Sequence, residues 1–301
     1  MKRASYGRGR GFTAWRGILE SALAHAYVGD WPARLWGFLP SEREVTTTRL
    51  TLTLPPGDGR ACRIAFISDL HIGPTTPIPL LERTFDIIRH ERPDVLLLGG
   101  DYVFLEAYPH RLATLSRLVG SIPCDAKLAV LGNHDLWTWD HAITAALSKA
   151  GATVLVNDVV ELPPPWSDVV VLGLDDPWTG NCDPCAAAAK IGKEAFRLVL
   201  CHSPDGLSSL TGIHFDLFLA GHTHGGQIAM PSGPIVLPNG PMCRLYPSGL
   251  SRFESRLVYT SRGIGTVDLP LRTFAPPDLL MLELERPSAQ PMAVAKISSV
   301  E

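Results

Sequence analysis

Nine polar residues, all of types that bind metal ions, follow short apolar runs of this chain. They are five histidines, three aspartates and one asparagine: Asp69, His71, Asp101, Asn133, His134, Asp135, His202, His222 and His224. A single Asp or His after a strand usually caps a helix or occupies a turn, but capping does not explain so many such sites in one chain. Side chains at the carboxyl ends of neighbouring strands in an open α/β sheet converge on one point. The pattern therefore predicts a metal site. Its imidazole content favours Mn, Fe or Zn over Mg, which prefers oxygen ligands and water.

The elements that must position these residues are short strands that alternate with helices. Apolar runs precede the polar residues at 64–67, 95–98, 128–131, 197–200 and 217–220, and helical spacing occupies 80–89, 110–118 and 141–150. Further strands are predicted at 49–54, 153–156, 169–172, 257–261 and 279–284, and the Pro/Gly-rich stretch from Ile228 predicts an ordered loop or hairpin. Nearly continuous Val, Leu and Ile in the strands indicates helices on both faces of the sheet. We therefore expect an α/β sandwich.

Five motifs that contain the polar residues occur in one order between about residues 64 and 227. They are Asp69-Leu70-His71, Gly100-Asp101, Gly132-Asn133-His134-Asp135, His202 and Gly221-His222-Thr223-His224. Together they resemble the calcineurin-like metallophosphoesterase family. The resemblance implies a four-layered α/β/β/α sandwich that hydrolyses phosphoester bonds with two divalent metal ions.

The resemblance also implies how seven ligands divide between the two ions. The first ion would be bound by Asp69, His71 and His224, the second by Asn133, His202 and His222, and both by Asp101, with one carboxylate oxygen to each ion. By the same resemblance, His222 and His224 would serve different ions. Their spacing suits this, since with Thr223 between them both side chains leave the same face of an extended turn. Two ions ~3.5–4 Å apart activate a bridging water, and the resulting hydroxide attacks phosphorus.

Three further residues are candidates for catalysis or substrate binding. By resemblance, His134 faces the substrate and either stabilises charge in the transition state or protonates the leaving oxygen. Asp135 either orients His134 or caps the following helix. Arg262 could bind a phosphate or diphosphate, although an ion-paired surface arginine is the favoured interpretation.

The C-terminal part of the chain narrows the substrate class. Gly225-Gly226-Gln227, the Pro-rich loop that follows it and residues 261–284 resemble a bacterial subgroup of the family. That subgroup includes phosphodiesterases and enzymes that split the pyrophosphate of UDP-diacylglucosamine in lipid A synthesis. The resemblance implies a phosphodiesterase. The alternatives are a UDP-2,3-diacylglucosamine pyrophosphatase-type hydrolase that acts on a lipid-linked substrate at the membrane surface, and a metal-binding scaffold without catalysis.

The N-terminal segment, residues 1–45, is predicted to be separate from a catalytic domain at residues 46–301. Residues 1–10 are basic and Gly-rich and are expected to be mobile. From Phe12 to Tyr27 apolar residues recur at helical spacing, and Gly29 is expected to end the helix. We expect the apolar stripe to pack on the core, which is the commoner arrangement. The alternative is peripheral contact of residues 12–39 with a membrane surface.

Composition and charge exclude several other classes. Members of the subgroup often carry an N-terminal membrane-spanning segment, but no run of ~18 apolar residues occurs here. A cytoplasmic location is therefore expected. The alternative is contact with the inner face of the membrane. A net charge of -3 gives no reason to expect nucleic acid as a partner. Cys182 and Cys185 form a single CxxC pair, which we interpret as a surface turn with two reduced thiols rather than a metal or redox site.

Overall fold

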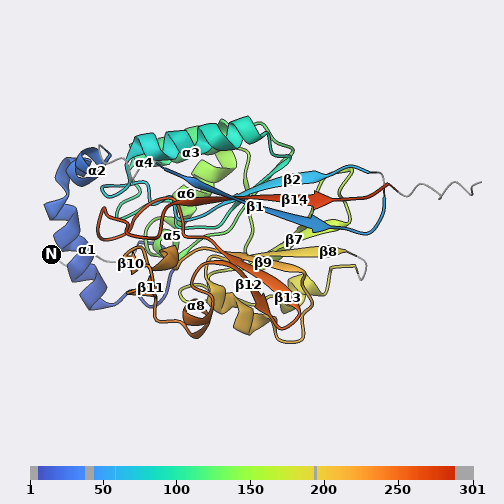
Figure 1. Cartoon of the computed structure of the whole chain (residues 1–301). Helices are drawn as coiled ribbons and strands as arrows, with labels where there is room; N and C mark the ends of the chain where they lie inside the picture. Colours follow the sequence, from blue (N-terminus) through green and yellow to red (C-terminus); the bar gives the residue numbers. More distant parts are fainter. Residues whose placement is uncertain (1–5, 38–43, 58, 193–194, 289–301) are drawn as a thin grey trace, which may run out of the picture.

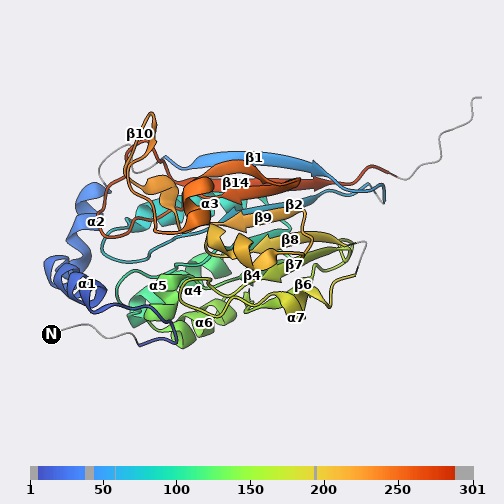
Figure 2. The same cartoon turned by 90° about the horizontal axis from the view of Figure 1, so that it is seen from below.

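Two six-stranded sheets pack face to face in the part of the chain that the computed structural model describes, residues 6–37, 44–57, 59–192 and 195–288 (Figures 1 and 2). In spatial order, the first sheet contains β1 (Thr46–Thr53), β14 (Asp278–Glu285), β2 (Cys62–Ile67), β3 (Val95–Leu98), β4 (Ala126–Ala129) and β5 (Thr153–Val154). The second sheet contains β12 (Gly249–Phe253), β13 (Arg256–Thr260), β9 (Leu217–Ala220), β8 (Phe196–Leu200), β7 (Val169–Gly173) and β6 (Asp158–Glu161).

Helices cover the outer face of each sheet. The first sheet is covered by α3 (Ile78–Glu91), α4 (Pro109–Gly120) and α6 (Asp140–Lys149), and the second by the shorter α7 (Cys185–Ala188), η3 (Pro204–Leu210) and α8 (Pro241–Leu245). In α3 the buried residues Leu81, Phe85 and Ile88 recur at helical spacing and face the sheet. The expected four-layered α/β/β/α architecture is confirmed.

The alternation of side chains along each strand divides the core into three layers. In β2, Ile64 and Phe66 pack between the two sheets, whereas Ala65 and Ile67 pack against the helices. In β8, Leu198 and Leu200 likewise face the first sheet and Val199 faces the outer helices. A strand buried on both faces needs apolar residues at every position, which is why these strands read as continuous apolar runs.

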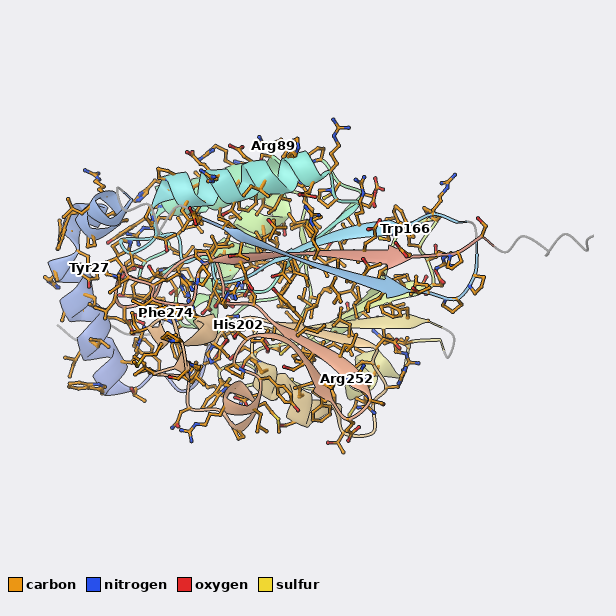
Figure 3. All side chains as sticks on the ribbon, in the orientation of Figure 1. Tyr27, Arg89, Trp166, His202, Arg252 and Phe274 are labelled. Atoms are coloured by element: carbon orange, nitrogen blue, oxygen red, sulfur yellow. The ribbon has the colours of Figure 1, made fainter. Side chains whose placement is uncertain are left out.

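The direction of the strands determines where their following loops meet. Strands β2, β3 and β4 are parallel, as are β7, β8 and β9. The loops after five of these strands come together at one end of the molecule, where α1 (Ala14–Ala26) and α2 (Trp31–Trp36) also lie (Figure 1). His202 follows β8 and lies near this end (Figure 3).

Strand β14 belongs to the first sheet although it comes last in the chain. It lies between β1 and β2, parallel to β1 and antiparallel to β2. The predicted strands at 49–54 and 279–284 are therefore partners, and β1 lies at the edge of the sheet. The Pro/Gly-rich stretch contains the short hairpin β10 (Ala229–Met230) and β11 (Gly233–Pro234), which confirms the expected ordered hairpin region.

The N-terminal helix is confirmed, but its packing differs from the expectation. After α1, Gly29 has a φ of 76° within the 3₁₀ turn η1 (Val28–Asp30) that joins α1 to α2. In α1 only Gly17 and Glu20 are buried, whereas Trp15 is 73% and Ile18 is 43% exposed. The expected burial of the whole apolar stripe is therefore wrong for Trp15 and Ile18. The buried carboxylate of Glu20 is compensated by an ion pair with Arg16, whose Nε lies 3.0 Å from Oε1 of Glu20.

The segment before α1 is held against the loops near the strand ends. The guanidinium of Arg8 donates two hydrogen bonds of 2.7 Å to the buried carboxylate of Asp175 and lies 3.5 Å from Asp140. The amide of Gly9 also donates to the carbonyl oxygen of Leu136 at 2.8 Å. These contacts hold residues 6–10 in place, so their expected mobility is wrong. The sequence did not reveal the contacts, because the carboxylates that bind Arg8 are distant from it in the chain. Residues 1–5 lie outside the described residues. The division at residue 45 stays a prediction. Among the described residues, no helix combines the length and apolarity that crossing a membrane requires.

Candidate metal centre

The nine polar residues identified in the sequence converge at the carboxyl ends of the strands. They follow β2, β3, β4, β8 and β9, and all except His222 are buried. Buried polar side chains of this kind need compensating partners. Two compact groups of potential metal ligands occur among the described residues, and each contributes three ligand atoms that lie within 4.8 Å of one another.

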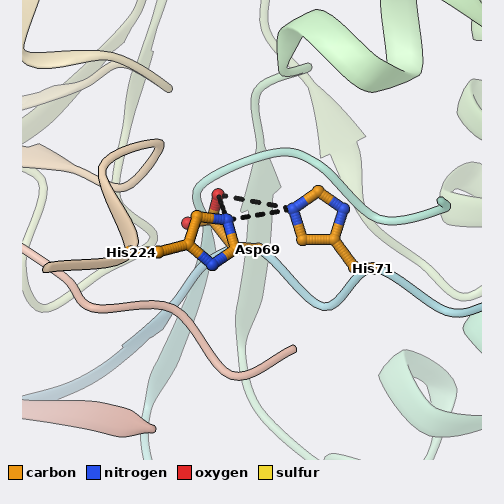
Figure 4. A group of neighbouring side chains, drawn as sticks. All are labelled: Asp69, His71 and His224. Carbon is orange, nitrogen blue, oxygen red and sulfur yellow. Dashed lines mark hydrogen bonds and ion pairs between the residues drawn. The ribbon is translucent and has the colours of Figure 1, made fainter. Parts of the chain in front are cut away.

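The first group contains Asp69, His71 and His224 (Figure 4). The Nε2 atoms of His71 and His224 lie 3.1 Å apart, and Nε2 of His224 lies 3.3 Å from Oδ1 of Asp69. Ligand atoms bound ~2.0–2.1 Å from one cation stand roughly 3–3.4 Å from each other. Two imidazole nitrogens and a carboxylate oxygen at this spacing can hold one divalent ion.

The second group contains Asp101, His202 and His222. Nε2 of His202 lies 3.2 Å from Oδ2 of Asp101 and 3.2 Å from Nδ1 of His222. Nδ1 of His202 lies 2.8 Å from the carbonyl oxygen of Gly99, and donation to this oxygen makes Nε2 the ring nitrogen that faces the group. Asn133, the further ligand expected for this ion, has a buried Oδ1 without a hydrogen-bond donor among the described residues.

Asp101 connects the two groups. Its Oδ2 lies 3.2 Å from Nε2 of His202 in the second group and 3.7 Å from Nε2 of His71 in the first. Its Oδ1 accepts a hydrogen bond of 2.9 Å from the amide of His134. Oδ2 is thus the oxygen of Asp101 that lies near ligand atoms of both groups, and the expected arrangement, with one carboxylate oxygen to each ion, stays a prediction.

The pair His222 and His224 divides between the two groups, as the resemblance implied. The reason given in the sequence analysis is wrong, however, because the turn is not extended: φ is 69° at His222 and 52° at His224. The 3₁₀ turn η4 (His224–Gly226) follows directly. The left-handed backbone, rather than the alternation of an extended strand, directs the two imidazoles to different groups.

Five of the predicted ligands have this left-handed backbone conformation, which is uncommon outside glycine. They are Asp69, His71, Asp101, His222 and His224, with φ between 43° and 69°. Such conformations persist only where the surrounding structure holds them, and they concentrate at functional sites. Although Asp and His tolerate this region better than most residues do, five cases in one cluster indicate that the fold positions these side chains against a local backbone preference.

Glycines leave room for the ligand carboxylates. A Cβ atom on Gly132 would lie 2.2 Å from Oδ1 of Asp101, and one on Gly221 would lie 2.3 Å from Oδ2 of Asp69. A Cβ atom on Gly263 would lie 2.6 Å from that of Asp69. These approaches are closer than side chains allow, so the glycines in the motifs serve to bring backbone against the ligands.

Burial and nearby charges determine which histidines are neutral. Burial lowers the pKa of His71 to about 3 and that of His222 to about 4, and it lowers the pKa of His134 well below the ordinary value. His202 differs: burial opposes its charged form, but the carboxylate of Asp101 raises its pKa well above the ordinary value. Neutral imidazole is the form that binds metal. His71 and His222 are therefore ready to bind at neutral pH, whereas His202 must release a proton.

His134 lies beside the first group without belonging to it. Its ring centroid is 5.1 Å from that of His71, 5.6 Å from Phe104 and 5.5 Å from Trp137. The structure decides between the two interpretations of Asp135. Its carboxylate accepts hydrogen bonds from three backbone amides, those of Asp101, Tyr102 and Gly132, at 2.7–3.0 Å. Asp135 therefore caps α5 (Asn133–Trp137) and ties it to the loop of Asp101, and no hydrogen bond to the His134 ring occurs.

Two arginines lie next to the ligands. Arg262 has the favoured ion-paired environment: its Nη2 lies 3.6 Å from Asp278, and its Nε donates to the carbonyl oxygen of Pro276. It also packs over Gly225, which adjoins His224. Sequence reasoning missed Arg272, which is buried and whose Nη2 lies 3.2 Å from Nδ1 of His224. Arg272 lies in the segment 261–284 that resembles the subgroup, but its contact with His224 arises only in the folded chain, so nothing local to Arg272 indicated it.

The CxxC pair takes no part in either group. Cys182 is half-buried and Cys185 is exposed, and neither forms a disulfide. Cys185 begins α7, and the interpretation as two reduced thiols in a surface turn stays a prediction.

Comparison with known proteins shows which family this chain resembles in sequence. A model of the calcineurin-like phosphoesterase family matches residues 62–226, which include all seven predicted ligands. Phosphodiesterase YaeI of Escherichia coli is 34% identical over 74% of this chain and 82% of its own length. The uncharacterized metallophosphoesterase YkuE of Bacillus subtilis is 30% identical over 82% of this chain and 87% of its own. The UDP-2,3-diacylglucosamine pyrophosphatase LpxG of Chlamydia trachomatis is 26% identical over 78% and 88%. The chain belongs to the calcineurin-like phosphoesterase family and is a metal-dependent hydrolase of phosphoester bonds.

Proposed function

We propose that this protein is a phosphodiesterase with a dinuclear metal centre. The observation that supports this most strongly is the position of Asp101, whose Oδ2 lies within 3.7 Å of ligand atoms from both groups. Two ligand groups that share one carboxylate suit two neighbouring ions. The relation to a protein named as a phosphodiesterase, at 34% identity, supports diesters as the substrate class.

Each residue of the site has a proposed role. The first ion would be held by Asp69, His71 and His224, the second by Asn133, His202 and His222, and both by Asp101. Two such ions, of Mn, Fe or Zn, would supply a nucleophile at neutral pH and bind the phosphoryl oxygens. His134 would stabilise charge in the transition state or, once protonated, donate a proton to the leaving oxygen. Burial lowers the pKa of His134 well below the ordinary value.

Metal analysis with a substrate panel tests this proposal. The purified protein should contain two ions per chain and hydrolyse a chromogenic phosphodiester faster than the matching monoester. Asp101→Ala should empty both positions, whereas Asp86→Ala, which removes an exposed carboxylate of α3, should change neither metal content nor rate. Two bound ions without turnover of a diester, a monoester, a cyclic nucleotide or UDP-diacylglucosamine would instead favour the metal-binding scaffold.

A lipid-linked substrate at a membrane surface is the second candidate. The observation that favours it is the exposure of large apolar side chains on α1, η1 and α2: Trp15, Ile18, Val28, Trp31 and Leu35. Phe274 is also exposed at this end of the molecule (Figure 3). Exposed apolar patches mark interaction sites, and tryptophan is typical of the membrane interface. In this candidate, residues 12–39 contact the inner face of the membrane peripherally, and Arg262 contacts the diphosphate.

Liposome flotation tests the membrane contact separately from catalysis. The double variant Trp15→Ser/Trp31→Ser should lose flotation with vesicles and keep its rate on the soluble diester. Leu250→Ser removes an apolar residue of β12 that is about as exposed as Trp31, 49% against 45%, and should float as the original protein does. Equal flotation of all three proteins would refute contact through these helices, and hydrolysis of UDP-2,3-diacylglucosamine would decide the substrate.

A further inference from the structure

A groove of about 1000 Å³ lies between α2, the start of α3 and the start of α4. Apolar surface predominates in it, and the apolar residues that line it include Ala33, Ile72, Pro77, Ile78 and Leu80. A smaller cavity of about 320 Å³ continues it beneath Tyr27 and Leu105 and shares Asp30, Arg34, His110 and Arg111 with it. None of the predicted metal ligands lines either cavity.

The charges around the groove are unbalanced. Its three carboxylates are all paired with arginines: Asp30 with Arg111, Glu82 with Arg117 and Asp86 with Arg89, at 2.8–2.9 Å. Arg34 and Arg83 also line the groove and are exposed, and neither pairs with a carboxylate of the described residues. The groove therefore combines an apolar interior with two uncompensated positive charges.

The surface around the groove is apolar as well. Ile78 and Tyr108, which line the two cavities, are 38% and 49% exposed, and Val28 lines the smaller cavity and is 73% exposed. The groove thus opens on the same face that carries the exposed apolar residues of η1 and α2. An apolar slot with a cationic edge, open towards an apolar surface, is complementary to one chain and the head group of an anionic lipid.

We propose that this groove binds an anionic phospholipid, with one acyl chain in the slot and the head group between Arg34 and Arg83. This inference refines the membrane-surface candidate and rests on that part of the proposed function. The groove also adjoins the metal centre. Ile72 and Gly73 line it and follow the predicted ligand His71, so their Cα atoms lie within about 4 and 8 Å of that of His71.

Binding of a monomeric lipid tests the groove directly. The probe is a lysophosphatidylglycerol series below its critical micelle concentration, measured by calorimetry on the full-length protein. Each methylene added to the chain should tighten binding about fourfold until the slot is filled. Thr114→Trp, which places a large side chain into the groove from α4, should weaken binding at least tenfold. Ala113→Trp is the matched control, because Ala113 is the preceding, exposed residue of α4 and does not line the groove.

The head-group contact is tested by reversing charge. Arg34→Glu/Arg83→Glu should lose the preference for phosphatidylglycerol over phosphatidylcholine vesicles in flotation. Arg252→Glu reverses an exposed arginine on β12, remote from α1 (Figure 3), and should keep that preference. Equal binding by the two tryptophan variants, or affinity independent of chain length, would overturn the proposal. Failure of the lipid site leaves turnover of the soluble diester normal, whereas lipid binding without any such turnover would overturn the proposed catalysis alone.

Discussion

Replacing Gly221 by alanine should disrupt the first ligand group without removing any ligand. Gly221 follows β9 and precedes His222, and its amide donates to the carbonyl oxygen of His202 at 2.8 Å. Its φ is not left-handed, so alanine adds no backbone strain there. The substitution therefore tests only whether the space occupied by the new methyl group is needed.

The structure gives the size of the conflict. The new Cβ would lie 2.3 Å from Oδ2 of Asp69 and 2.1 Å from Oγ of Ser68, whereas ordinary contacts begin at 3.4 Å. Both neighbours are fully buried and cannot turn into solvent. The carboxylate of Asp69 must therefore move by about 1 Å, although ligands tolerate displacements of only ~0.2 Å. A displacement of this size costs about 10²-fold in rate, and overpacking costs about 1–3 kcal/mol of stability.

Metal content, rate and melting temperature distinguish the possible outcomes. Gly221→Ala should bind fewer ions, lose the first ion before the second and turn over a chromogenic diester about 10²-fold more slowly. Gly120→Ala is the matched control: a Cβ there meets nothing closer than 3.9 Å, so metal content and rate should not change. A Gly221→Ala protein with two ions and nearly normal turnover would show that Asp69 is not held where the argument requires.

Three further predictions follow from the same geometry. His134→Ala should keep two ions and lose about 10²–10⁴ in rate, measured with the diester and by metal analysis; normal turnover would remove His134 from the mechanism. Arg8→Gln should lower the free energy of unfolding by about 1–2 kcal/mol, because it leaves a buried carboxylate with fewer hydrogen-bond donors. Arg8→Lys should restore part of this loss, as measured by thermal unfolding. Equal melting temperatures of all three proteins would refute the contact. The metal-free protein should melt at a lower temperature at pH 5 than at pH 7. The unfolded chain takes up protons near pH 6.5 that folded His71 and His222, with pKa values of about 3 and 4, do not bind. His202 and Asp135, whose pKa values are raised, oppose this trend, so a higher melting temperature at pH 5 would mean that they outweigh His71 and His222.

Much of the site could be predicted because its signals are local. A strand buried on both faces is a continuous apolar run, and the residue that follows it lies at the edge of the sheet. Asp69, Asp101 and His202 were identified by type and by position after such runs. Local sequence information was sufficient to identify these residues, because the order of strands and polar residues along the chain already specifies which side chains reach the shared edge.

Other features of the site have partners that no local pattern identifies. Arg272 contacts His224 across 48 residues, and Arg8 contacts Asp175 across 167. The role of Asp135 was left open for the same reason, since its three amide donors include two from the loop after β3. Each of these contacts depends on which loops meet at the edge of the sheet.

The sequence by itself therefore determined the fold class, the family and the residues able to bind metal, because residue type, spacing and apolar periodicity carry that information locally. The tertiary structure alone decided how these residues are used. It placed Oδ2 of Asp101 between the two groups, held five ligands in left-handed backbone conformations and left Trp15 exposed on α1. These outcomes depend on packing between segments that are far apart in the chain, where the free energy of the whole fold outweighs local preference.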